Sequence, residues 1–201
     1  MRIFRSVRAA SRIVTASAFH MEGKHEESLK AIEGLSTSDR ERLDPTSRYA
    51  IASIEAANLV LLPRDLARAA KLLEDIREIY EPPEDILLYA HAKHGLGDEA
   101  AAEKLLERAG SRREGGRVLL GRVVLLENKK QREVIFHTLR GLLLIKLGRT
   151  DEALEDFARS AAIPTPGWYS DRARALLPPK GGDFDPRSSL APIVTGIDGD
   201  T

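Results

Sequence analysis

The chain has no cysteine, so neither a disulfide bond nor a thiolate-bound metal can stabilise it. Aromatic residues are scarce at 5%, and no apolar run reaches the roughly 18 residues that a membrane-spanning helix requires. A net charge is also lacking, because 31 basic and 31 acidic residues cancel. These absences argue against a disulfide scaffold, a membrane span and a general affinity for nucleic acid, and they predict a soluble, cytoplasmic protein.

Charged residues are abundant, at 31%, and they occur together with many alanines and leucines, a mixture that favours helices. The 201 residues are enough for one sizeable core or for one short array of repeats. The fold class that the composition predicts is therefore all-α.

The most informative stretch is residues 139–162, LRGLLLIKLGRTDEALEDFARSAA. Gly148 can adopt the left-handed conformation that ends a helix, and Thr150 can cap the next one. Gly141 in the first helix and Ala153 in the second leave room for two backbones to approach, and Phe157 fills the space beside them. The stretch therefore predicts two closely packed antiparallel helices.

The same pattern returns upstream, in weaker form, at three further places. The small residue of the second helix recurs at Ser28, Ala69, Ala102 and Ala153, which lie 41, 33 and 51 residues apart. These turns and small residues resemble the tetratricopeptide repeat, a family of stacked helix–turn–helix units with a period of 34 residues. The resemblance implies a short right-handed α-solenoid of about four such repeats. The sequence itself adds an extra segment between repeats three and four, and residues 168–177 are expected to form a C-terminal capping helix.

Composition divides the chain into two regions. Residues 1–177 are expected to form the repeat domain, and residues 178–201, rich in proline, glycine and aspartate, a disordered or loosely packed tail. Residues 1–20 contain four arginines and no acid, which is typical of a mitochondrial targeting segment or of a basic helix on a membrane surface. We interpret them as a retained helix, because the helical pattern continues into a turn at Gly23 and the partner helix would otherwise be orphaned.

Two segments do not fit the repeat. Residues 36–46 are expected to hold one short helical turn, because Ser38 and Glu41 have capping-box spacing. In residues 111–130, Ser111 and Glu114 have the same spacing, but the following run of valine and leucine fits either a buried helix or a hairpin. We favour an extra helix there, because both neighbouring regions are helical.

Patterns that carry chemistry are weak in this sequence. No nucleophile elbow, phosphate-binding glycine loop or HExxH pattern is present, so we expect neither an enzyme nor a cofactor. His91 and His94 have helical spacing, but no third ligand accompanies them, and we expect no metal. Glu152 and Asp156 are interpreted as part of a solvated face. An arginine cluster without interleaved aromatics makes nucleic-acid binding a disfavoured alternative; it comprises Arg108, Arg112, Arg113, Arg117 and Arg122.

In the family that the chain resembles, ligands lie in a concave groove lined by the first helix of each repeat. The resemblance therefore implies a mostly apolar groove that binds a helix or peptide of another protein, and the chain would act as a non-enzymatic interaction scaffold. The alternatives are a structural module that self-associates and an adaptor inhibited by its own tail. The implied lining residues are Ile13, Ser17, Ile54, Glu55, Asn58, Leu61, Leu87, Leu88, His91, His94, Thr138, Leu139, Leu142 and Ile145.

Overall fold

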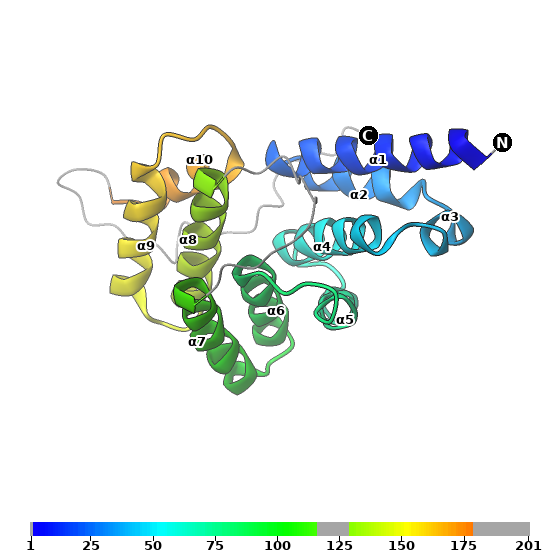
Figure 1. The fold of residues 1–201 in the computed structure, drawn as a ribbon. Helices are drawn as coiled ribbons and strands as arrows, with labels where there is room; N and C mark the ends of the chain where they lie inside the picture. The colour runs from blue at the N-terminus through cyan, green and yellow to red at the C-terminus, as the bar shows by residue number, and fades with distance from the viewer. Residues whose placement is uncertain (1, 116–128, 179–201) are drawn as a thin grey trace, which may run out of the picture.

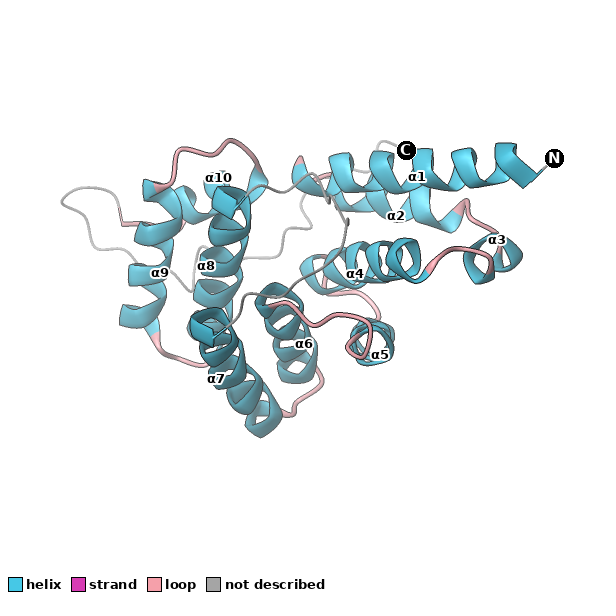
Figure 2. Cartoon of the chain, viewed as in Figure 1, coloured by secondary structure: helices cyan, strands magenta, loops and turns pink. Residues whose placement is uncertain are grey.

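The computed structural model describes residues 2–115 and 129–178, and within these ranges all regular secondary structure is helical (Figures 1 and 2). The all-α prediction is therefore confirmed for the part of the chain that the structure describes. The helices are α1 (Arg2–Met21), α2 (His25–Glu33), α3 (Thr37–Glu41), α4 (Pro45–Leu61), α5 (Leu66–Ile76), α6 (Pro83–Gly95), α7 (Glu99–Gly115), α8 (Lys129–Lys146), α9 (Thr150–Ala162) and α10 (Trp168–Ala175).

Four pairs of consecutive helices make the closest contacts: α1 with α2, α4 with α5, α6 with α7, and α8 with α9. The first helices of these pairs also touch one another in chain order, α1 against α4, α4 against α6, and α6 against α8. The last helix, α10, lies against both α8 and α9, as expected for a helix that covers the final pair. The arrangement buries much of α4, α6 and α8, whereas the described side chains of α1 remain largely at the surface.

The turn inside each pair has the same hydrogen bond. A backbone N–H after the turn donates to the carbonyl five residues earlier, which is the pattern of a Schellman helix end. Three of the turns place a glycine at positive φ directly before the donor, and the second turn has Pro63 there at φ 22°. The four bonds are Lys24 N to Phe19 O (2.8 Å), Arg64 N to Leu59 O (2.9 Å), Asp98 N to Lys93 O (2.9 Å) and Arg149 N to Leu144 O (2.8 Å).

The small residues after these turns are inaccessible to solvent, as the sequence predicted. Ser28, Ala69, Ala102 and Ala153 all have 0% exposure. In the last pair, a Cβ added to Gly141 would lie 2.6 Å from Cε1 of Phe157, a ring that is itself 0% exposed. The predicted close approach of α8 and α9, with Phe157 beside the glycine, is therefore confirmed.

The apolar core is nearly continuous. One cluster runs from α4 to α10, and a smaller one joins α1, α2 and α4 around Ile32, Ile51 and Ile54. Helix α4 contributes to both clusters and is buried around most of its circumference, because α1, α2, α5 and α6 all pack against it. Such a helix needs cover on several sides, which its apolar sequence already indicates.

Three local predictions were wrong. Ser36, not Ser38, caps α3, because its Oγ accepts from the backbone N–H of Asp39 (3.2 Å). Ser111 does not begin a helix but lies within α7, where its Oγ donates to the carbonyl of Glu107 (3.2 Å), a back-bond that helical serines commonly make. Arg149, not Thr150, is the N-cap of α9, and its carbonyl accepts from the N–H of Ala153 (3.1 Å).

Residues 111–130, which fitted either an extra helix or a hairpin, are only partly described. Helix α8 begins at Lys129, so residues 132–136, the partner strand of the hairpin alternative, are helical. The choice between helix and hairpin for residues 116–128 lies outside the described residues, as do residues 179–201 of the tail predicted for residues 178–201.

Candidate functional site on the first helices

Most of the residues predicted to line a binding groove lie in the interior. Eleven of the fourteen are buried, and three are half-buried: Ile13, Ser17 and His94. The buried ones divide into apolar side chains of the main core or the α1–α2–α4 cluster and polar side chains with partners inside the chain. The apolar ones are Ile54, Leu61, Leu87, Leu88, Leu139, Leu142 and Ile145, and the polar ones are Glu55, Asn58, His91 and Thr138.

Asn58 of α4 is the centre of a buried hydrogen-bond network. Its Oδ1 lies 2.8 Å from Nδ1 of His20 and 3.0 Å from Nδ1 of His25, and its Nδ2 donates to Oγ of Ser28 (2.7 Å). An amide oxygen only accepts, so both histidines must donate from Nδ1. The hydroxyl of Tyr169 lies 2.8 Å from the remaining nitrogen of His20 and donates to it when that ring is neutral. The network therefore fixes a proton on Nδ1 of both imidazoles.

Burial opposes a charge on these rings. It lowers the pKa of His20 from 6.5 to about 4, and it lowers the pKa of His25 as well. The hydrogen bond to Asn58 acts in the opposite direction on both rings but is the smaller influence. Nε2 of His25 is buried without a hydrogen-bond partner, and this ring lies edge-on to Trp168 with centroids 4.9 Å apart.

The aromatic pair at the start of α10 brings the end of the described chain onto its first helix pair. A Cβ added to Gly23, in the α1–α2 turn, would lie 2.2 Å from Cδ1 of Trp168, so the indole sits directly on this turn. Tyr169 extends the contact to His20, 149 residues away in the sequence. Helix α10 thus covers the last pair and also closes against the first, and the network around Asn58 lies at this junction.

Glu55 and Asp85 are two buried carboxyl groups with different partners. Glu55 forms ion pairs with Arg40 and Arg68. Asp85 receives hydrogen bonds from the hydroxyls of Tyr49 (2.6 Å) and Ser53 (2.8 Å). Burial without a paired cation raises the pKa of Asp85 from 3.8 to about 6, although both hydroxyls act to lower it.

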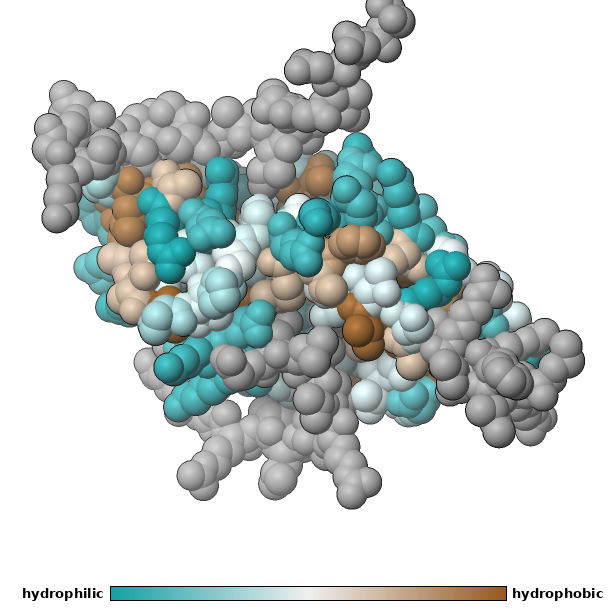
Figure 3. All heavy atoms as spheres, turned by 90° about the horizontal axis from the view of Figure 1, so that it is seen from above, coloured by the Kyte–Doolittle hydropathy of each residue, from teal (hydrophilic) through white to brown (hydrophobic). Residues whose placement is uncertain are grey.

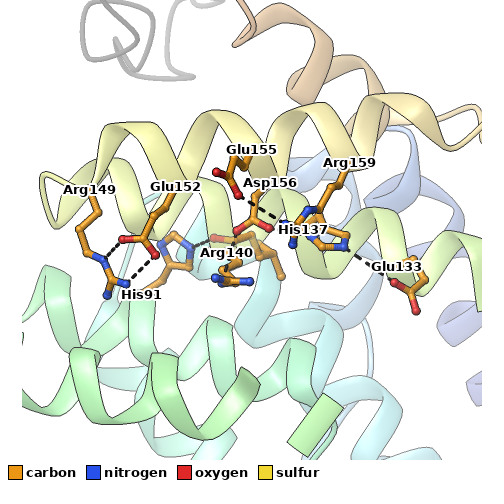
Figure 4. A network of polar contacts seen from close by, with 10 residues as sticks. His91, Glu133, His137, Arg140, Arg149, Glu152, Glu155, Asp156 and Arg159 are labelled. Carbon is orange, nitrogen blue, oxygen red and sulfur yellow. Dashed lines mark hydrogen bonds and ion pairs between the residues drawn. The ribbon is translucent and has the colours of Figure 1, made fainter. Parts of the chain in front are cut away.

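A second polar network joins α6, α8 and α9 (Figure 4). Nδ1 of His137 lies 2.7 Å from Oδ1 of Asp156, and Nε of Arg140 lies 3.3 Å from the other oxygen. Asp156 is therefore buried between two basic groups, and its predicted place on a solvated face was wrong. Glu152, one turn earlier, is exposed and pairs with Arg149 through both oxygens (2.7 Å each).

His91 attaches α6 to α8, and Thr138 attaches α8 to α10. Nε2 of His91 donates to the carbonyl of Leu139 (2.8 Å), and its Nδ1 lies 3.3 Å from Nζ of Lys146. Burial, helped by the charge of Lys146, lowers the pKa of His91 from 6.5 to about 3. Thr138 donates to the carbonyl of Tyr169 (3.1 Å) and so attaches α8 to α10.

The polar groups described above are buried side chains that bond to one another inside the fold. Among the described residues there is no group of three or more histidine, aspartate or glutamate side chains placed to hold a metal ion. His137 with Asp156 has the donor–acceptor relation of a catalytic pair, but both side chains are buried and no hydroxyl bonds to the ring within the described part of the chain. Sequence reasoning missed His20, His25, Tyr169 and Asp85; only the two histidines flanking the Gly23 turn offered a signal.

The described surface is a mixture of small polar and apolar areas, as the view from above illustrates (Figure 3). Its exposed large apolar side chains, Val14, Ile79 and Leu96, belong to different elements. In the arginine cluster, Arg108 and Arg112 both pair with Glu81, and the other three members have no described side chain.

No described helix is long and apolar enough to cross a membrane. A scan against protein-family models gives no match to this chain. Searches of the curated proteins and of the solved structures likewise give none.

Proposed function

We propose that this chain is a non-enzymatic helical-repeat module, of the tetratricopeptide-like kind, that binds another protein. One observation carries the proposal, namely that the four helix pairs are built alike. Each pair has the same type of turn hydrogen bond and a fully buried small residue in its second helix, and the first helices touch in chain order. Repeated pairs of this kind bury a core between neighbours and leave long outer surfaces, which is the usual basis of partner binding in repeat proteins.

The interior position of the predicted groove residues changes how the proposal is tested. Leu88 and Leu142 are 4% and 7% exposed, so a glutamate at either position would bury an unpaired carboxylate and unfold the chain. Loss of binding in such variants would say nothing about an interface. Substitutions must instead be made at Ile13, Ser17 and His94, which are half-buried.

The experiment is affinity purification with the full chain as bait, with bound proteins identified by mass spectrometry. Each candidate is then titrated against Ser17→Glu and His94→Glu. A partner on the first-helix face should bind at least tenfold more weakly to one of them, while both variants keep the wild-type circular dichroism spectrum. A chain that captures no protein at micromolar concentration contradicts the proposed function, and a partner insensitive to both substitutions contradicts only the first-helix face.

The junction with α10 favours a second candidate, an adaptor that its own C-terminal segment keeps closed. Trp168 and Tyr169 already rest on the first pair and on the network around Asn58, where a partner would otherwise reach the first helices. Two truncations separate the possibilities: removal of residues 178–201 tests the tail, and removal of residues 168–201 tests the helix as well. Tighter partner binding after either deletion supports the closed adaptor, and weaker or unchanged binding after both contradicts it.

A further inference from the structure

A cavity of about 170 Å³ opens between α3, α4 and α5, away from the α10 junction. Its apolar wall consists of Leu43, Ile51, Ala52 and Leu72, and most of its lining is apolar. An apolar cavity of about 150 Å³ is enough to bind benzene. A cavity of this size therefore accepts one leucine- or phenylalanine-sized side chain.

The size also excludes larger ligands. Sites for cofactors and drug-sized molecules occupy about 300–1,000 Å³ and enclose most of the ligand. A side-chain pocket of this volume is instead the kind of feature into which a protein partner inserts one anchor residue. A peptide or protein segment is thus the class of ligand that fits.

Three charged side chains also line the cavity, and they are not equivalent. The carboxylate of Glu55 is already neutralised, since one oxygen pairs with Arg40 and the other with Arg68. Arg40 also donates to the carbonyl of Ile32 (3.1 Å), so its guanidinium is held in place. Arg48 is exposed and makes no side-chain hydrogen bond or ion pair with any described residue. The cavity therefore has an apolar floor, a neutralised acid and one available guanidinium.

We propose that this cavity binds one apolar side chain of an acidic partner segment, with Arg48 pairing with a carboxylate beside that side chain. The inference rests on the proposed protein-binding function and specifies the chemistry of the partner. An acidic segment is preferred over a basic one because two arginines and only one glutamate line the cavity. A guanidinium also binds a carboxylate with two parallel hydrogen bonds.

The probes are capped tripeptides titrated into the isotope-labelled full chain and followed by NMR. Acetyl-Glu-Leu-Glu-amide should shift the backbone resonances around Leu43, residues 48–55 and Leu72 in a saturable manner. Acetyl-Glu-Gly-Glu-amide, which lacks the anchor, and acetyl-Lys-Leu-Lys-amide, which reverses the charge, should bind at least tenfold more weakly. Equal binding of all three peptides, or shifts confined to other elements, would overturn the proposal.

Arg48→Glu is the decisive variant, because it changes an exposed side chain without a described partner. It should weaken acetyl-Glu-Leu-Glu-amide at least tenfold and strengthen the lysine peptide. Arg42→Glu is the matched control, since Arg42 is also exposed, lies six positions away and does not line the cavity; its affinities should stay within twofold. Unchanged peptide binding by Arg48→Glu refutes the role of the guanidinium.

The same variant separates this inference from the proposed function. If a partner identified by affinity purification binds wild type and Arg48→Glu equally, the cavity is not its contact, and the proposed function stands. If the glutamate peptide binds as described but the chain captures no protein, the cavity recognises its ligand and the function as a protein-binding module fails.

Discussion

Acidification from pH 6.5 to pH 4.5 should destabilise the fold through its buried histidines. His20 and His91 have folded-state pKa values of about 4 and about 3, against 6.5 for a free histidine. Between these limits the unfolded chain binds more protons than the folded one, so the free energy of unfolding falls as the pH falls. Each histidine lowers the free energy of unfolding by about 1.4 kcal/mol per pH unit. The two together therefore lower it by about 5 kcal/mol over this interval.

Asp85 acts in the opposite direction. Its folded-state pKa of about 6 exceeds the ordinary 3.8, so the folded chain holds this proton more tightly, and acidification below pH 6 stabilises it. From pH 6 to pH 4.5 the protonation of Asp85 raises the free energy of unfolding by about 2 kcal/mol. The net loss is about 3 kcal/mol, and the lowered pKa of His25 adds to it in the same direction.

Thermal unfolding followed by circular dichroism measures the effect. For a chain of this size a loss of about 3 kcal/mol corresponds to a decrease in Tm of about 10 °C. His91→Gln should remove about 2.5 kcal/mol of the histidine contribution, and so most of the net pH dependence, because glutamine can still donate to the carbonyl of Leu139 but does not titrate. A Tm that is constant or rises between pH 6.5 and pH 4.5 would show that these rings are not buried and neutral in the native state.

Four substitutions test the packing, the network and the helix ends. Gly141→Ala should destabilise by about 1–3 kcal/mol, measured by urea unfolding, because its Cβ would lie 2.6 Å from the ring of Phe157; wild-type stability would contradict the close approach of α8 and α9. Asn58→Leu should cost about 3 kcal/mol in the same assay, since two buried histidine N–H groups lose their acceptor, and a neutral result would mean that the network is absent. Gly148→Ala should lower stability by about 1 kcal/mol because φ is 79°, whereas Gly110→Ala, within α7, should raise it slightly.

The helix pairs were predictable because their signals are local. Gly148 ends a helix because glycine readily adopts positive φ. The two helices of each pair touch at a small residue, which lies four or five positions after the N–H donor of the turn hydrogen bond. Side-chain roles on the first helices were not predictable in the same way. Asn58 carries no local sign that two histidines from α1 and α2 converge on its oxygen, because that meeting depends on how the first two pairs are placed.

The predicted groove residues illustrate the same limit. Their spacing places them on the first helix of each pair, but spacing cannot tell whether a face is open or covered. Thr138 is buried because α10 supplies the carbonyl of Tyr169 to it, a contact across 31 residues. The cavity beside Glu55 was missed for the opposite reason, since it is formed by α3, an insertion that the repeat pattern does not include.

Contact between α10 and the first pair has a consequence for how the chain unfolds. In an open repeat array each unit touches only its neighbours, so damage at one end stays local. Here the hydroxyl of Tyr169 donates to His20, and Tyr169→Phe should remove about 1 kcal/mol of stability by deleting that bond. Because the bond joins the two ends, amide hydrogen exchange should accelerate in α10 and at the end of α1 together, while exchange in α6 and α7 is unchanged. Faster exchange in α10 alone would mean that α10 covers only the last pair, and that the network around Asn58 does not hold the ends together.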